Sequence, residues 1–179
     1  MRRDIIICGA GGQGVVLAGE LLSQALFDEG YEVVNTRSYG AEARGGRCRS
    51  EIIVSDGEIY DIQLTEADIL IAMSLPAYRR YIGRLRAGGL ALLDEEVYRG
   101  LSPEEVRDDV ETVSIPASEI ASRLGNPIVA NMVLLGALIG KTGLMSLERL
   151  KEAISRRVRP SMREINLKAL EEGYEAIRG

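Results

Sequence analysis

Residues 4–14 read Asp4-Ile5-Ile6-Ile7-Cys8-Gly9-Ala10-Gly11-Gly12-Gln13-Gly14 and decide the fold. The apolar run 4–8 is typical of a buried strand, and the glycines lead directly into a helix expected at about 13–28. Such a turn brings backbone N–H groups and the positive end of a helix against a negative group. The stretch therefore predicts an anion-binding turn. The alternative, that the glycines only let strand and helix pack closely, is equally compatible with this motif alone.

The rest of the chain continues an α/β pattern. The Asp56-Gly57 pair predicts a hairpin between the segments 50–54 and 58–62. The helix expected at 128–140 is apolar almost all round, and Gly136 and Gly140 in it would let another backbone approach closely. The remaining expected elements are strands at 31–36, 68–73, 89–93 and 111–115, and helices at 76–86, from 102, at 117–124, at 147–158 and from 161, where Ser161 and Glu164 form a capping box.

These elements predict one α/β domain over residues 1–179. Its expected architecture is a Rossmann-like, mostly parallel sheet with an antiparallel hairpin and helices on both faces. The 179 residues are 46% apolar and 27% charged, which suffices for one full core, and no polar linker divides them.

Charge and hydropathy limit the function classes. The net charge of −5 argues against a surface that coats nucleic acid. No signal region precedes the first strand, and the longest apolar run, 128–140, is too short to span a bilayer. We expect a soluble, cytoplasmic protein that binds neither nucleic acid nor membrane.

The side chains available for chemistry are few. The sequence has no histidine, which removes the commonest general base and metal ligand. Its two cysteines, Cys8 and Cys48, do not form a CxxC pair, so they can build neither a zinc site nor an iron–sulfur cluster by themselves. The chain is therefore expected to take part in chemistry only together with other chains.

The glycine spacing also fits a dinucleotide site. Gly9, Gly11 and Gly14 satisfy G-x-G-x-x-G, which normally requires an acid at the end of the second strand. Here Asn35-Thr36-Arg37 stands in that place. No acid is available for an adenosine ribose, but Arg37 could accept a 2′-phosphate, so an NADP site stays open as an alternative.

A second group of polar residues follows the second strand, at 37–47. Three arginines and three glycines occur within these 11 residues of an acidic protein. Guanidinium groups pair with phosphate or carboxylate, and glycine pairs let a ligand reach the backbone. An exposed loop of solvated arginines is the plainer interpretation, but the composition favours a functional loop at the same sheet edge as the glycine turn.

Two other polar positions call for partners. Asn131 lies inside the apolar helix, where its amide must be hydrogen-bonded, most simply to a neighbouring loop. Asp94, Glu95 and Glu96 follow a strand and could hold a metal or act as bases. With no partner group at a recognisable spacing, we interpret them as a solvated strand end.

Three segments together resemble a known family. The sequences GAGGQGVVLAGELL at 9–22, SYGAEARGGRCRSEIIVSD at 38–56 and ANMVLLGAL at 130–138 resemble the gamma subunit of 2-oxoacid:ferredoxin oxidoreductases. The similarity covers almost the whole chain, including 166–174. In that family SYG is commonly followed by proline, whereas this chain has Ala41, a change that would loosen the loop without removing its charges.

The resemblance implies a multisubunit enzyme. Such an enzyme converts a 2-oxoacid and coenzyme A to acyl-CoA and carbon dioxide and passes electrons to ferredoxin. Thiamine diphosphate and iron–sulfur clusters would lie on alpha, beta and delta-type partner subunits, and this chain would hold no catalytic residue and no metal. Coenzyme A binding and subunit contacts carry over to Gly11, Gly12, Gln13, Gly14, Tyr39, Gly40, Arg44, Gly45 and Gly46.

Pyruvate, branched-chain 2-oxoacids, 2-oxoglutarate and arylpyruvates are all substrates within the family. The chain looks most like a separate gamma subunit of the 2-oxoglutarate type. A self-contained NADP-dependent oxidoreductase and a purely structural assembly subunit remain as alternatives.

Overall fold

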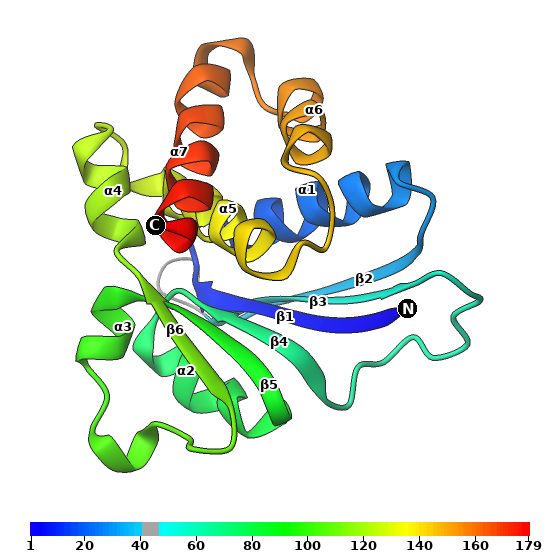
Figure 1. Cartoon of the computed structure of the whole chain (residues 1–179), viewed down its shortest axis with the longest axis vertical. Coiled ribbons are helices and arrows are strands. Elements are labelled where there is room, and N and C mark those ends of the chain that lie inside the picture. The colour runs from blue at the N-terminus through cyan, green and yellow to red at the C-terminus, as the bar shows by residue number, and fades with distance from the viewer. Residues whose placement is uncertain (41–46) are drawn as a thin grey trace.

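A computed structural model describes residues 1–40 and 47–179. They form one six-stranded sheet in the order β2-β3-β1-β4-β5-β6 with helices on both faces (Figure 1). The strands are β1 (Arg2–Ala10), β2 (Glu32–Tyr39), β3 (Arg47–Ser55), β4 (Ala67–Ala72), β5 (Leu85–Asp94) and β6 (Glu111–Ile115). The α-helices are α1 (Val15–Asp28), α2 (Leu75–Tyr81), α3 (Glu95–Arg99), α4 (Ala117–Arg123), α5 (Ala130–Thr142), α6 (Leu147–Arg157) and α7 (Pro160–Arg178).

Five of the six strands point the same way, and β3 alone runs against them. It pairs antiparallel with β2 on one side and with β1 on the other, while β1, β4, β5 and β6 pair in parallel. The mostly parallel sheet is confirmed. The predicted hairpin partner is wrong, because β3 pairs with the preceding β2 and residues 58–62 form no strand.

The sheet separates two apolar cores. In β1, Ile5 and Ile7 face one core and Ile6 and Cys8 face the other, as expected for a strand buried on both sides. The larger core lies under α1, α4, α5, α6 and α7, and the smaller one lies under α2 and α3 (Figure 1). The prediction of helices on both faces is confirmed.

Several predicted boundaries are wrong for local reasons. The helix expected at 76–86 ends at Tyr81, continues as a 3-10 helix (Ile82–Arg84), and gives way to β5 at Leu85. The second strand extends through Tyr39, and the unpredicted α3 begins at Glu95. Helix α7 begins with Pro160 in its first turn rather than with a Ser161 cap, whereas the capping box of Ser102 and Glu105 is present and opens a 3-10 helix (Pro103–Glu105).

Helices α5 and α7 cross at their glycines. A Cβ atom on Gly136 would overlap the carbonyl oxygen of Leu170, and one on Gly173 would overlap that of Val133. The predicted close approach at Gly136 is therefore confirmed, with α7 as its partner. Because the two backbones touch directly, α7 packs its apolar side against the mainly apolar α5, in agreement with the sequence pattern.

Among residues 1–40 and 47–179, no helix combines the length and the apolar composition that crossing a bilayer requires.

Replacing Gly173 by alanine should destabilise the fold. The new methyl group would meet the backbone of α5 rather than a movable side chain, so α5 and α7 must separate, at a cost of about 3 kcal/mol. Urea denaturation followed by circular dichroism measures this loss. Gly83→Ala is the matched control, because nothing lies within 4 Å of a Cβ atom there. Equal midpoints for the two variants would contradict the proposed crossing.

Candidate functional site

The glycine turn (residues 9–14) connects β1 to α1 and is held by the side chain of Gln13. The Gln13 Oε1 accepts a hydrogen bond from the Ala10 N–H at 2.7 Å, and Nε2 donates to the Met73 carbonyl oxygen at 2.9 Å. The amide thus ties the turn to the residue that follows β4. The Gln13 side chain, to which the resemblance carries over coenzyme A binding and subunit contacts, shapes the turn through these two hydrogen bonds.

The second half of the turn requires glycine at two positions. Gly12 and Gly14 have φ angles of 91° and 72°, in the left-handed region that side chains disfavour. Gly14 is also the N-cap of α1, and a Cβ atom on it would overlap the Asn131 amide. That amide donates to the Gly14 carbonyl oxygen at 3.1 Å. The buried Asn131 therefore has the loop partner that its position in an apolar helix calls for.

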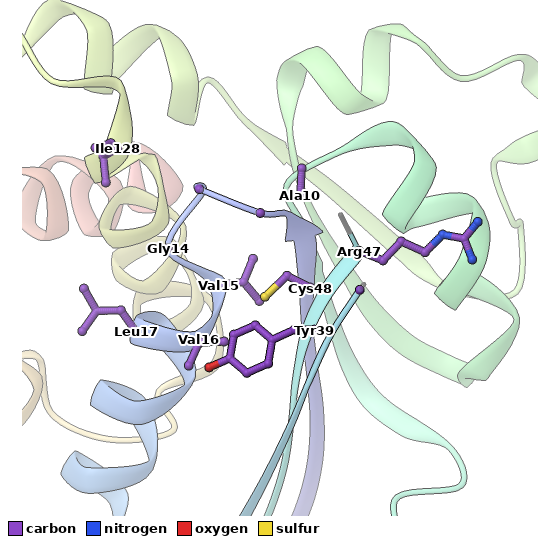
Figure 2. A pocket seen from close by; sticks show the side chains of 12 residues that line it. Ala10, Gly14, Val15, Val16, Leu17, Tyr39, Arg47, Cys48 and Ile128 are labelled. Carbon is purple, nitrogen blue, oxygen red and sulfur yellow. The ribbon is translucent and has the colours of Figure 1, made fainter. Parts of the chain in front are cut away.

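The first turn of α1 has no side-chain cap and contains no acidic residue. The first N–H groups of a helix have no acceptor within the helix, and they carry the positive end of its dipole. In α1 the Val16 N–H lies at the start of β3, beside Cys48 on the pocket wall (Figure 2). The end of the helix can therefore receive an acceptor from a ligand.

The start of β3 and the end of β2 lie directly beside the glycine turn. In the sheet Ala10 is the partner of Arg47, and Tyr39 is the partner of Cys48. The Gly40 N–H donates to the Arg47 carbonyl oxygen at 2.6 Å, which closes the end of this ladder. The two predicted motifs therefore meet at one sheet edge. The predicted residues Arg44, Gly45 and Gly46 lie outside the described residues.

A pocket of about 430 Å³ lies between the two motifs, and we call it the turn pocket. It contains five of the nine predicted site residues, Gly11, Gly12, Gly14, Tyr39 and Gly40. Its other lining residues, which are not among the nine predicted site residues, are Ala10, Val15, Val16, Leu17, Arg47, Cys48 and Ile128. In Figure 2 the Tyr39 ring lies near Val16 and Cys48, while the Arg47 side chain points away from them.

The thiol of Cys48 forms part of the wall of the turn pocket. The residue is 8% exposed, and burial raises the pKa of its thiol, an effect that a hydrogen bond from the Val16 backbone partly offsets. Cys8 is fully buried inside the sheet, and burial raises its pKa strongly. Both thiols are therefore mainly protonated near neutral pH.

Arg37 does not take the position that an NADP site needs. Its guanidinium forms an ion pair with Glu20 of α1, and Glu20 also pairs with Arg157 of α6 at 3.2 Å. In addition, β3 lies between β2 and β1, whereas a dinucleotide fold places these two strands side by side. The geometry therefore disfavours the NADP alternative.

Asp94 is not the solvated strand end that we expected. It is 3% exposed, and its carboxylate accepts hydrogen bonds from the Ser118 hydroxyl and from the Ser118 N–H, the latter at 3.3 Å. Glu95 pairs with Arg99 one helical turn later, and Glu96 is exposed. The expectation fails at Asp94 because the chain continues into α3 and α4 packs against the end of β5.

Comparison with known proteins adds an independent line of evidence. Residues 4–176 match the family model described as pyruvate ferredoxin/flavodoxin oxidoreductase. A 2-oxoglutarate synthase subunit KorC of Methanothermobacter marburgensis is 43% identical over 99% of this chain and 97% of its own. The subunit of the same name from Methanocaldococcus jannaschii is 41% identical over 99% of this chain and 95% of its own.

Two solved structures share the fold over nearly the whole chain. The gamma subunit of a keto/oxoacid ferredoxin oxidoreductase from Geobacter sulfurreducens has a TM-score of 0.83 and 35% identity, with 98% of each chain covered. A 2-oxoglutarate:ferredoxin oxidoreductase from Magnetococcus marinus, solved with 2-oxoglutarate, coenzyme A and succinyl-CoA bound, has a TM-score of 0.88 and 26% identity. The match covers 99% of this chain and 31% of that one. The chain belongs to the pyruvate ferredoxin/flavodoxin oxidoreductase family.

Proposed function

We propose that this chain is the gamma subunit of a 2-oxoglutarate:ferredoxin oxidoreductase. The enzyme would convert 2-oxoglutarate and coenzyme A to succinyl-CoA and carbon dioxide and pass the released electrons to ferredoxin. The observation that carries the proposal is the full-length similarity, above 40% identity, to 2-oxoglutarate synthase subunits of about the same length. The Geobacter gamma subunit, of similar length and fold, supports the role of a separate subunit.

The redox chemistry would belong to partner subunits of alpha, beta and delta type in a cytoplasmic complex. An iron–sulfur cluster needs about four thiolate ligands, and this chain has two cysteines, both buried and on separate strands. The clusters would accordingly lie on the partners. By the family resemblance thiamine diphosphate would lie there too, and ferredoxin would be reached through them. In the Magnetococcus chain the region similar to this chain is about a third of the whole, so about two thirds of that chain have no counterpart here.

The contribution of this chain would be to bind coenzyme A in the turn pocket. Coenzyme A carries phosphate groups next to less polar adenine and pantetheine parts. The turn pocket offers a matching combination, with the uncapped N-terminus of α1 and the glycine backbone beside the apolar side chains of Val16, Leu17 and Ile128. The predicted residues Arg44, Gly45 and Gly46 would complete the site, and Gln13 would hold the turn in shape.

Coenzyme A should protect Cys48 from alkylation in the assembled complex. Desulfo-coenzyme A is the suitable ligand, because it has no thiol to consume the reagent. Since burial raises the pKa of Cys48, iodoacetamide labelling is best followed at a pH of about 9, where more thiolate forms. At a ligand concentration about ten times its dissociation constant, the labelling rate measured by mass spectrometry should fall about tenfold.

Cys8 serves as the internal control for this experiment. It is fully buried in β1, outside the turn pocket, so it should stay unlabelled with and without ligand. Protection of Cys48 by NADPH but not by desulfo-coenzyme A would instead support the NADP alternative. An unchanged labelling rate with both ligands would contradict a ligand site in the turn pocket.

Arg44→Ala should weaken coenzyme A binding by the complex. Loss of a charge-assisted hydrogen bond to phosphate costs about 1.5–3 kcal/mol, which corresponds to roughly a 10- to 150-fold higher dissociation constant in calorimetry. Arg3→Ala is the matched control, because Arg3 lies at the opposite end of β1 from the glycine turn. Equal affinities of the Arg44 variant and the unmodified complex would favour a purely structural subunit.

A further inference from the structure

A second pocket lies on the other side of the glycine turn. It has a volume of about 210 Å³ and shares Gly12 and Ile128 with the turn pocket. Its remaining lining residues are Gln13, Met73, Asp94, Ser118, Pro127 and Ala130. We call it the Asp94 pocket. Because it lies over the carboxyl ends of β4 and β5, it occupies the edge of the sheet where ligands of α/β folds usually bind.

Asp94 gives this pocket a buried carboxylate that has no ionic partner among the described residues. The carboxylate is 97% buried, and its hydrogen-bond donors, the hydroxyl and the N–H of Ser118, are both neutral. No lysine or arginine of residues 1–40 and 47–179 forms an ion pair with it. The other buried acids, Asp4 and Glu51, each pair with arginines. A buried charge is costly without a counter-charge, so the pocket calls for a cation.

The shape and lining of the pocket indicate what kind of cation fits. Met73, Pro127, Ile128 and Ala130 form apolar walls, and the carboxylate stands among them. A carboxylate has about four acceptor positions, and Ser118 uses one on each oxygen. Lysine and arginine have a long aliphatic stem that ends in a cationic group. The stem can pack against the apolar walls, and the cationic group can donate hydrogen bonds to the free acceptor positions of the carboxylate.

The surroundings favour a protein as the source of this cation. Ile128, which lines the pocket, is 57% exposed. A large exposed apolar side chain beside a buried charge suits a surface that another protein covers. Coenzyme A does not suit this pocket, because Asp94 would repel its phosphates.

We propose that the Asp94 pocket receives a lysine or arginine side chain of a partner subunit and so anchors this chain in its complex. This inference rests on the proposed function only in requiring a multisubunit enzyme. The inference adds a defined contact, an ion pair with Asp94 between apolar walls. The Asp94 pocket lies next to the turn pocket but favours a cation, whereas the turn pocket favours an anion.

Asp94→Asn tests the contact, because it removes the charge and keeps the size of the side chain. The dissociation constant between this subunit and the rest of the complex should rise roughly 30-fold or more, and its dependence on salt should become weaker. Glu175→Gln is the matched control: it removes one exposed negative charge of α7 outside both pockets, so association should keep its strength and its salt dependence. An unchanged dissociation constant for Asp94→Asn would overturn the proposal.

Two further measurements test the proposed Asp94 contact independently of how well the variant folds and of coenzyme A binding. In the unmodified protein, hydrogen exchange at residues 94–98 and 126–131 should slow on assembly even if the variant folds poorly; equal exchange in the free and assembled chain would overturn the proposal. Coenzyme A affinity of the assembled Asp94→Asn complex should remain unchanged, which separates this contact from the turn pocket. Weaker coenzyme A binding with normal association would also overturn it, because Asp94 would then serve the ligand site.

Discussion

The structure depends on how two side-chain amides hold the glycine turn. Gln13 forms hydrogen bonds with both the Ala10 N–H and the Met73 carbonyl oxygen, which connects the turn to the residue after β4. Asn131 bonds to the Gly14 carbonyl and connects the same turn to α5. The turn therefore connects β1, β4, α1 and α5, and residues of the turn line both pockets. A shift of this turn would change the two pockets together.

The reversed strand β3 sets the surroundings of the glycine turn apart from those of a dinucleotide fold. It inserts between β1 and β2, so the residues that would meet a ribose are displaced by the width of a strand. The same insertion brings Tyr39, Arg47 and Cys48 to the glycine turn. The fingerprint spacing reflects the strand–turn–helix geometry that both kinds of fold need, whereas the ligand depends on which strand lies next to it.

Local patterns predict much of this architecture, while pairing between distant segments is beyond them. The buried β1, the apolar α5 and the close approach at Gly136 follow from residue type and spacing. The pairing of β3 does not, because Asp56-Gly57 signals a turn equally well when the next segment finds no partner. The burial of Asp94 was missed for a related reason, since Ser118, its partner, lies 24 residues away. Apolar pocket residues such as Val16 and Ile128 carry no signal that distinguishes them from core residues.

The two pockets lie on either side of the glycine turn and favour ligands of opposite charge. On one side, backbone N–H groups at the start of α1 suit an anion, and on the other a buried carboxylate suits a cation. Of the residues that the structure describes, Gly12 and Ile128 line both pockets. If a partner's cation occupies the Asp94 pocket, the same contact that assembles the complex also covers Ile128 at the rim of the turn pocket. Assembly would then help to enclose the turn pocket. A ligand proposed to bind there would consequently bind more tightly to the complex than to the separate subunit.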